Sequence, residues 1–227
     1  MFTETADLYD LVYSFKDYPR EVERLRAMVG REGGTLLDVA CGTGHHLALL
    51  AEHYGVEGVD LDPAMVELTR ARGLAAGVGD LLTLDLGRRF DVVTCLFSSI
   101  GYVSDLRRAV ERLAAHVAPG GAVVVEPWLA PEQIKPFHVG LVTAESDAVK
   151  VARMTSLDVD GRECVMVLQY LIGRAGVVEH RTERHRTWLW TRDEYAGAFA
   201  AAGLDAVHDE EGLMGRGLWL ATAPRGT

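Results

Sequence analysis

The chain has 227 residues, and its 33 acidic and 23 basic side chains give a formal net charge of −10. Its composition, with 48% hydrophobic and 25% charged residues, is that of a globular protein and excludes a disordered or collagen-like chain. The acidic balance also argues against nucleic-acid binding, which needs a basic surface.

The sequence shows neither a membrane span nor a targeting segment. No apolar run reaches the length of a membrane helix, and the acidic N-terminus lacks the basic-then-apolar pattern of a signal peptide. The three cysteines, Cys41, Cys95 and Cys164, are far apart and form no CxxC pair, which is typical of reduced thiols. We therefore expect a cytoplasmic protein without a membrane partner.

The first half of the chain alternates between predicted strands and helices. Apolar residues at helical spacing predict a helix over 19–29. Short apolar runs then predict strands over 35–40, 56–60, 75–79 and 90–97, with helices over 45–53, 63–72 and 105–116. Pro119-Gly-Gly121 is predicted to be a turn before a fifth strand over 122–126. This alternation is typical of a parallel sheet covered on both faces.

After Trp128 the predicted strands follow one another without helices. Segments 149–158 and 163–172 flank Asp160-Gly161, which predicts a hairpin, and a turn over 173–176 leads to a strand over 177–190. A helix over 192–202 and a last strand over 217–222 complete the chain. The pattern predicts a Rossmann-like α/β fold with a mostly parallel, doubly wound sheet and an inserted antiparallel layer. Its expected parts are a helical cap (1–34), the sheet domain (35–128 and 188–227) and the inserted strands (129–187).

A glycine-containing turn, Leu37-Asp38-Val-Ala-Cys-Gly42-Thr-Gly44, joins the first predicted strand to a helix. Such a turn lets a ligand approach the backbone at the edge where open α/β sheets bind ligands. Asp60 and Asp80 end the next two strands, where carboxylates can accept from a ribose diol and from the adenine amine. Either residue alone could be a turn or capping residue. Cys41 is interpreted as a small residue that fills the turn rather than as a nucleophile.

These features resemble motif I of the class I S-adenosyl-L-methionine (SAM)-dependent methyltransferases, in the form Asp38-x-x-x-Gly42-x-Gly44. The competing interpretation is a nicotinamide-dependent Rossmann protein, which normally has the pattern G-x-G-x-x-G. The equivalent window here lacks the third glycine. SAM carries a sulfonium and an ammonium instead of phosphates, so acidic strand ends suit it better.

A narrower resemblance covers almost the whole chain. It rests on Tyr9-Asp-Leu-Val, Lys16-Asp-Tyr18, Leu36-Leu-Asp-Val-Ala-Cys-Gly-Thr-Gly44, Phe97-Ser-Ser-Ile-Gly101, Val125-Glu-Pro-Trp128 and Gly215-Arg-Gly-Leu218. These motifs are similar to those of the actinobacterial N,N-dimethyltransferases of antibiotic amino-sugar biosynthesis, which act on TDP-3-amino-3,6-dideoxyhexoses. The resemblance implies methyl transfer from SAM to the amine of a TDP-linked amino-deoxysugar, with S-adenosyl-L-homocysteine as product.

The same resemblance implies roles for individual residues. The cofactor-binding set is Tyr9 and Tyr18 at the methionine end, Asp38, Ala40 and Gly42 along the backbone turn, Asp60 at the ribose, and Leu61, Met65, Asp80, Leu81 and Leu96 around the adenine. The substrate-binding set is Ser98, Ser99, Glu126, Trp128, His185 and Arg216, with Arg216 a partner for the diphosphate. No metal site is expected, because His45 and His46 are adjacent on a helix and do not share a face.

Close relatives commonly have a histidine where this chain has Tyr102. A tyrosine is a poor base at neutral pH, so Tyr102 is assigned as an orienting hydrogen-bond acceptor for the amine; the alternative is packing against the cofactor. Glu126 could accept from the amine or hold Trp128, and Arg216 could be only a solvated turn residue.

Three other functions stay open: methylation of another small amine or hydroxyl compound, non-catalytic nucleotide binding, and the nicotinamide-dependent reaction. Exposed apolar residues on the inserted strands lead us to expect a homodimer.

Overall fold

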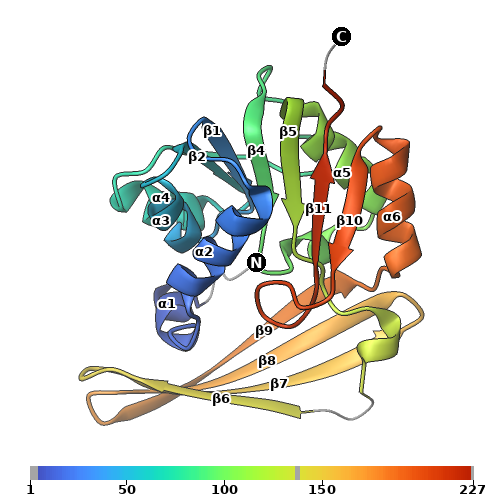
Figure 1. Cartoon of the computed structure of the whole chain (residues 1–227). Helices are drawn as coiled ribbons and strands as arrows, with labels where there is room; N and C mark the ends of the chain where they lie inside the picture. The colour runs from blue at the N-terminus through green and yellow to red at the C-terminus, as the bar shows by residue number, and fades with distance from the viewer. Residues whose placement is uncertain (1–4, 136–138, 226–227) are drawn as a thin grey trace.

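The computed structural model describes residues 5–135 and 139–225. The parts of the expected cap, inserted layer and sheet domain that fall on 1–4, 136–138 and 226–227 lie outside the described residues. Within the described ranges, a seven-stranded sheet with helices on both faces stands on a separate four-stranded sheet (Figure 1). The predicted α/β fold with an added antiparallel layer is confirmed.

The seven-stranded sheet is parallel except at one edge. Its strands lie in the order β10 (Asp205–Asp209), β11 (Leu218–Thr222), β5 (Val117–Val125), β4 (Phe90–Cys95), β1 (Thr35–Val39), β2 (Gly55–Asp60) and β3 (Ala76–Val78). Strands β1 to β5 pair in parallel, whereas β11 pairs antiparallel with both β5 and β10. The chain winds outward from β1 in one direction and from β4 in the other, so the strand order reverses between β1 and β4. Ligands of open α/β sheets bind beyond the carboxyl ends of the strands at such a reversal.

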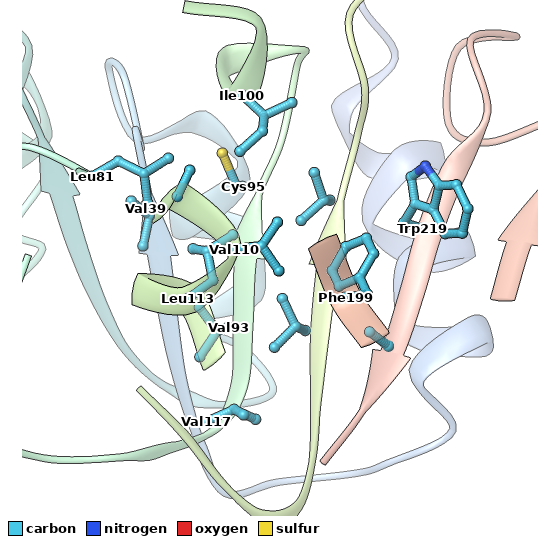
Figure 2. Packing of buried hydrophobic residues seen from close by; sticks show 14 of the residues in the cluster. Val39, Leu81, Val93, Cys95, Ile100, Val110, Leu113, Val117, Phe199 and Trp219 are labelled. Atoms are coloured by element: carbon cyan, nitrogen blue, oxygen red, sulfur yellow. The ribbon is translucent and has the colours of Figure 1, made fainter. Parts of the chain in front are cut away.

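The central strands are apolar on both faces because helices cover both sides. On one face, Leu36 of β1 and Val92 of β4 pack with α2 (Tyr18–Val29) and α3 (His45–Leu50). On the other face, Val93 packs with α5 (Leu106–Ala115) and α6 (Arg192–Ala201), where Phe199 lies beside Trp219 of β11 with ring centroids 5.6 Å apart (Figure 2). Helix α4 (Pro63–Ala71) follows β2.

Several helices begin at residues whose side chains cap them. Asp17, Asp62, Asp105 and Thr191 accept hydrogen bonds from backbone N–H groups in the first turns of α2, α4, α5 and α6. Asp62, rather than Asp60, caps α4, so the Asp60 carboxylate is available for another role. No helix in the described ranges has the length and apolar character needed to cross a membrane.

The four-stranded sheet is antiparallel throughout, in the order β6 (Val139–Glu145), β7 (Lys150–Asp160), β8 (Glu163–Arg174) and β9 (Val177–Trp188). Its inner face packs against the short helices η1 (Ala6–Leu8) and α1 (Tyr9–Val12). The expected N-terminal cap therefore divides: α1 packs on the four-stranded sheet, whereas α2 packs on the seven-stranded sheet.

The structure differs from the predicted elements at several places. The predicted turn at Pro119-Gly-Gly121 was wrong: these residues lie inside β5, where the register with β4 shifts and Gly120 has a φ of 71°. Glycines signal a bulge as well as a turn. The β7–β8 hairpin turns at Gly161 and Arg162, one residue later than predicted. Strands β6 and β10 were missed because edge strands of mixed composition carry a weak pattern.

Candidate active site

A first cavity lies beyond the carboxyl ends of β1 and β2, beside the reversal of strand order. Its walls come from α1, the start of α2, the loop after β1, the end of β2 and the start of α4. The structure brings most of the predicted cofactor-binding residues together there, namely Tyr9, Tyr18, Asp38, Ala40, Gly42, Asp60, Leu61, Met65 and Leu96.

The loop after β1 forms one wall of the first cavity. Ala40, Gly42 and Gly44 have φ angles of 61°, 57° and 80°, and a Cβ atom on Gly44 would lie 2.9 Å from Thr69 Oγ1. Thr69 donates to the Gly42 carbonyl over 2.8 Å, so α4 holds the loop in shape. Glycine is required at position 44 both by the positive φ and by this close approach.

Cys41 belongs to the same loop and has a structural role. Its side chain is buried, and burial raises the pKa of the thiol. Its amide donates to the Val59 carbonyl over 3.0 Å, which ties the loop to β2. Because the thiolate is the reactive form of cysteine, Cys41 is a packing residue, as the sequence indicated.

Two buried carboxyl groups give the first cavity its electrostatic character. Burial raises the pKa of Asp38 to about 7, although Thr94 donates to it over 2.7 Å. Burial also raises the pKa of Asp60, whose oxygens accept from the amides of Gly42 at 2.8 Å and Asp62 at 2.9 Å. A ligand with a positive charge would favour the ionised forms, and the remaining lone pairs of Asp60 can accept from hydroxyl groups. The donor set therefore fits a cationic nucleoside such as SAM.

A buried ion network supports the wall around Tyr18. Lys16 Nζ donates to Glu21 over 2.8 Å, and His46 Nε2 lies 2.8 Å from the other oxygen of the same carboxylate. His45 stacks on Tyr18 with ring centroids 4.7 Å apart. Both histidines line the first cavity, which the sequence analysis missed. Their position directly after the glycine loop is the signal that could have identified them.

A second cavity lies between the carboxyl edge of the seven-stranded sheet and the inner face of the four-stranded sheet. The two cavities share four lining residues: Tyr9, Phe97, Ser99 and Tyr102. The predicted substrate residues Ser98, Trp128 and Arg216 line the second cavity as well. A donor group in the first cavity and an acceptor group in the second would therefore meet at the shared residues.

The loop after β4 is strained where the cavities meet. Phe97 and Ser98 have φ angles of 52° and 62°, which is unfavourable for residues other than glycine. Glu126 accepts from the Phe97 amide over 2.7 Å, and Ser98 donates to the Pro127 carbonyl over 2.8 Å. Arg216 donates to Ser98 Oγ over 2.9 Å. These contacts hold the loop in a conformation that its own sequence does not favour.

The next turn, η2 (Ser99–Tyr102), is packed tightly against Trp128 in the segment after β5. A Cβ atom on Gly101 would lie 2.5 Å from Trp128 Cβ. Arg216 lies over the Trp128 ring, 5.3 Å from its centroid. Tyr102 Oη lies 2.8 Å from His185 Nδ1 of β9, and burial raises the pKa of the Tyr102 hydroxyl. The turn thus joins the two sheets.

Arg153 of β7 is a lining residue that the sequence analysis missed. It lies on the inner face of the four-stranded sheet, is buried, and donates to Tyr13 Oη over 3.0 Å. Its guanidinium also lies 5.0 Å from the centroid of the Tyr13 ring. The sequence carries no motif around Arg153, because only the packing of the two sheets brings it to the cavity.

Four predicted site residues lie outside both cavity linings. Asp80 is exposed and accepts from the Leu82 amide over 2.9 Å, and Leu81 packs into the core beside α5. Glu126 is fully buried and holds the Phe97 amide rather than Trp128, the partner considered for it from the sequence. His185 is buried behind Tyr102. The side chains of Leu81, Glu126 and His185 are buried in the protein, whereas that of Asp80 is exposed and turned back to its own backbone.

Comparisons with known proteins bear on this site. The chain matches a family described as a methyltransferase domain over residues 11–209. It is 44% identical over 228 residues to a dTDP-3-amino-3,6-dideoxy-alpha-D-glucopyranose N,N-dimethyltransferase from Streptomyces fradiae, covering 95% of this chain and 89% of that protein.

Solved structures extend the likeness to the fold. The crystal structure of Streptomyces venezuelae DesVI matches with a TM-score of 0.90 and 36% identity, covering 96% of this chain and 98% of that chain. A SAM-bound amino pentose methyltransferase from Micromonospora echinaspora, involved in calicheamicin biosynthesis, matches with a TM-score of 0.81 and 39% identity, covering 91% of this chain and 89% of that chain.

Proposed function

The chain belongs to the methyltransferase domain family and uses SAM as its methyl donor, and we propose that its acceptor is the amino group of a TDP-linked amino-deoxysugar. The reaction is N,N-dimethylation in antibiotic sugar biosynthesis, as in the relative from Streptomyces fradiae. The observation that carries this proposal is the meeting of an acidic cavity and an arginine-containing cavity at Tyr9, Phe97, Ser99 and Tyr102.

In this proposal the first cavity holds the donor. SAM, when bound, supplies a methyl group on a positively charged sulfur. Asp60 accepts from the ribose hydroxyls, Asp38 provides negative charge beneath the loop, and Tyr9 and Tyr18 cover the methionine end. Leu61 and Met65 would hold the adenine, and the backbone of 40–42 would support the ligand from the loop after β1. The adenine edge would be bound without the side chains of Asp80 and Leu81, which lie outside the lining.

The second cavity holds the nucleotide sugar. Arg216 binds the diphosphate, because a guanidinium pairs well with phosphate oxygens, and Trp128 provides a flat apolar surface beside it. Arg153, which is buried, adds a second positive charge on the opposite wall. Within the overall negative charge of the chain, these two arginines provide the local compensation that an anionic substrate requires. Residues 139–187 thus cover the acceptor together with Trp128 and Arg216, while the described residues that hold the donor lie within 9–102.

The main task of the chain is to position the amine. A neutral amine attacks in line with the bond that breaks, and correct placement of two reactants can supply about 7–11 kcal/mol of the barrier. Tyr102 accepts an N–H of the amine and turns its lone pair toward the donor. Burial raises the pKa of Tyr102, so the residue keeps its proton and is not a general base; solvent takes the proton released from the amine.

Mass spectrometry after incubation with SAM and a panel of TDP-3-amino and TDP-4-amino sugars tests the proposal. We expect products heavier by one and then two methyl groups. Methylation of a different amine or hydroxyl compound alone would replace the proposed acceptor class. Tyr102, where close relatives commonly have a histidine, lines the second cavity. Calorimetry should detect binding of SAM and none of NAD.

We further propose that the protein is a cytoplasmic homodimer. The outer face of the four-stranded sheet exposes an apolar stripe in which Leu141 and Met154 are directly paired across β6 and β7, with Leu171 on β8. Apolar patches of this kind are typical of interaction surfaces. The three cysteines are free thiols, which supports a reducing compartment.

A further inference from the structure

Behind Tyr102, the strand β9 presents a buried carboxyl group and a buried imidazole in a row. Tyr102 Oη lies 2.8 Å from His185 Nδ1, and His185 Nε2 lies 3.3 Å from Glu183 Oε2. Glu183 and His185 are two residues apart on one strand and therefore share its inner face. They are 5% and 2% exposed. Burying such groups is costly unless they are paired. Their position beside the meeting point of the cavities therefore indicates a function for the pair.

The order of the three groups determines where the protons lie. An ionised carboxylate only accepts hydrogen bonds, so Glu183 favours the imidazole form that carries its proton on Nε2. A carboxylate partner commonly fixes the tautomer of a histidine in this way. His185 Nδ1 then has a lone pair, and the Tyr102 hydroxyl must donate to it. Burial, which raises the pKa of Tyr102, keeps this proton on the oxygen.

A hydroxyl that donates to His185 has only lone pairs left for the cavity. Toward an amine it can accept an N–H, which leaves the nitrogen lone pair free to attack the methyl group. A hydroxyl without a fixed partner could instead donate to the nitrogen lone pair. That lone pair would then be engaged in a hydrogen bond and could not attack the methyl group. The direction of one hydrogen bond therefore decides whether Tyr102 assists or opposes the reaction.

We propose that Glu183 and His185 are positioning residues that commit the Tyr102 hydroxyl to the role of hydrogen-bond acceptor for the substrate amine. The inference rests on the proposed function, in which the amine lies at the meeting point of the two cavities. It adds Glu183, which the sequence did not indicate, and it gives His185 a role behind Tyr102 instead of in direct contact with the sugar.

NMR of the protein with ¹⁵N-labelled histidine tests the proton arrangement without any substrate. The resonances of His185 are assigned by their loss in His185→Gln. We expect the neutral ring to carry its proton on Nε2 in the wild type, and to lose this preference in Glu183→Gln. A proton on Nδ1 in the wild type would overturn the inference, because the ring would then donate to Tyr102.

A double-mutant cycle in kcat tests the consequence for catalysis. We expect Tyr102→Phe and His185→Gln each to lower kcat about tenfold, since one positioned hydrogen bond contributes about that much, with little change in KM for SAM. The double variant should be no slower than Tyr102→Phe, because His185 acts only through the hydroxyl. Losses that multiply, or full kcat in His185→Gln, would contradict the proposal.

His180→Gln is the matched control. His180 lies on the same strand but is exposed on the opposite face, so this variant should keep the wild-type kcat. The two proposals fail differently. A wild-type protein that methylates no amine would overturn the proposed function, whereas a methyltransferase with the Nδ1 tautomer would overturn this inference alone.

Discussion

Single residues determine what the first cavity can bind, and the sequence indicated most of them. Asp38 and Asp60 reach the cavity because they lie in or at the end of parallel strands, whose carboxyl ends share one edge of the sheet. Asp80 follows the same rule in sequence, yet its carboxylate accepts from the Leu82 amide in a local turn. Whether a short acidic side chain turns back to its own backbone is not visible in a strand pattern.

Asp38 makes the stability of the unliganded protein depend on pH. Its pKa is about 7 in the folded protein and about 4 in the unfolded chain. The unfolded chain therefore loses this proton first, and stability falls as the pH rises from about 4 to about 7. Asparagine does not ionise, so Asp38→Asn does not lose stability in this way. Relative to the wild type, its free energy of unfolding should rise by up to about 4 kcal/mol between pH 4 and pH 7.

Urea unfolding of both proteins at a series of pH values measures this difference. Asp38→Asn should also bind SAM more weakly, because the cavity loses a negative charge. A stability difference that stays constant from pH 4 to pH 8 would contradict the assignment of a buried, late-titrating carboxyl group to Asp38.

At the scale of elements, the parallel sheet was predictable because its buried strands are continuously apolar. The geometry of η2 was not predictable, since it depends on a contact with Trp128 in the segment after β5. A Cβ atom on Gly101 would lie 2.5 Å from Trp128 Cβ, so Gly101→Ala must displace one of them. We expect kcat/KM for the acceptor to fall about 100-fold, as displacements near 1 Å can cause, with SAM affinity unchanged. Gly77→Ala, where a Cβ would meet nothing within 4 Å, is the control; equal losses in both variants would contradict the account.

The turn between β8 and β9 places an alanine in an unfavourable backbone conformation, which a substitution can relieve. Its two turn residues, Ala175 and Gly176, have φ angles of 46° and 81°, as a two-residue turn with positive φ at both positions requires. Alanine is unfavourable there, whereas asparagine tolerates this region. Ala175→Asn should therefore stabilise the protein by about 0.5–1 kcal/mol, measured by thermal unfolding. Gly176→Ala should destabilise it, and a lower melting temperature for Ala175→Asn would refute the turn assignment.

At the scale of the whole molecule, the sequence predicted an inserted strand layer but not how it docks. Arg153, Glu183 and His185 approach the second cavity only because the inner face of the four-stranded sheet packs over the carboxyl edge of the other sheet. No local pattern contains that arrangement, since it depends on register in one sheet and on packing between two.

The proposed dimer concerns the opposite face of the same sheet. Met154→Lys places a charge in the exposed apolar stripe and should convert the dimer to a monomer, whereas Ser156→Lys, two residues along the same face of β7, should have a smaller effect. Light scattering coupled to gel filtration measures the mass. A monomeric wild-type protein would refute the proposed dimer.

The most direct test of the account is a crystal structure with S-adenosyl-L-homocysteine and a TDP-amino sugar bound together. The account predicts the nucleoside of the first ligand at Asp60, the diphosphate of the second at Arg216, and the sugar nitrogen within hydrogen-bonding distance of Tyr102 Oη. A sugar amine that lies away from the meeting point of the two cavities, or a nucleotide sugar bound outside the second cavity, would contradict it.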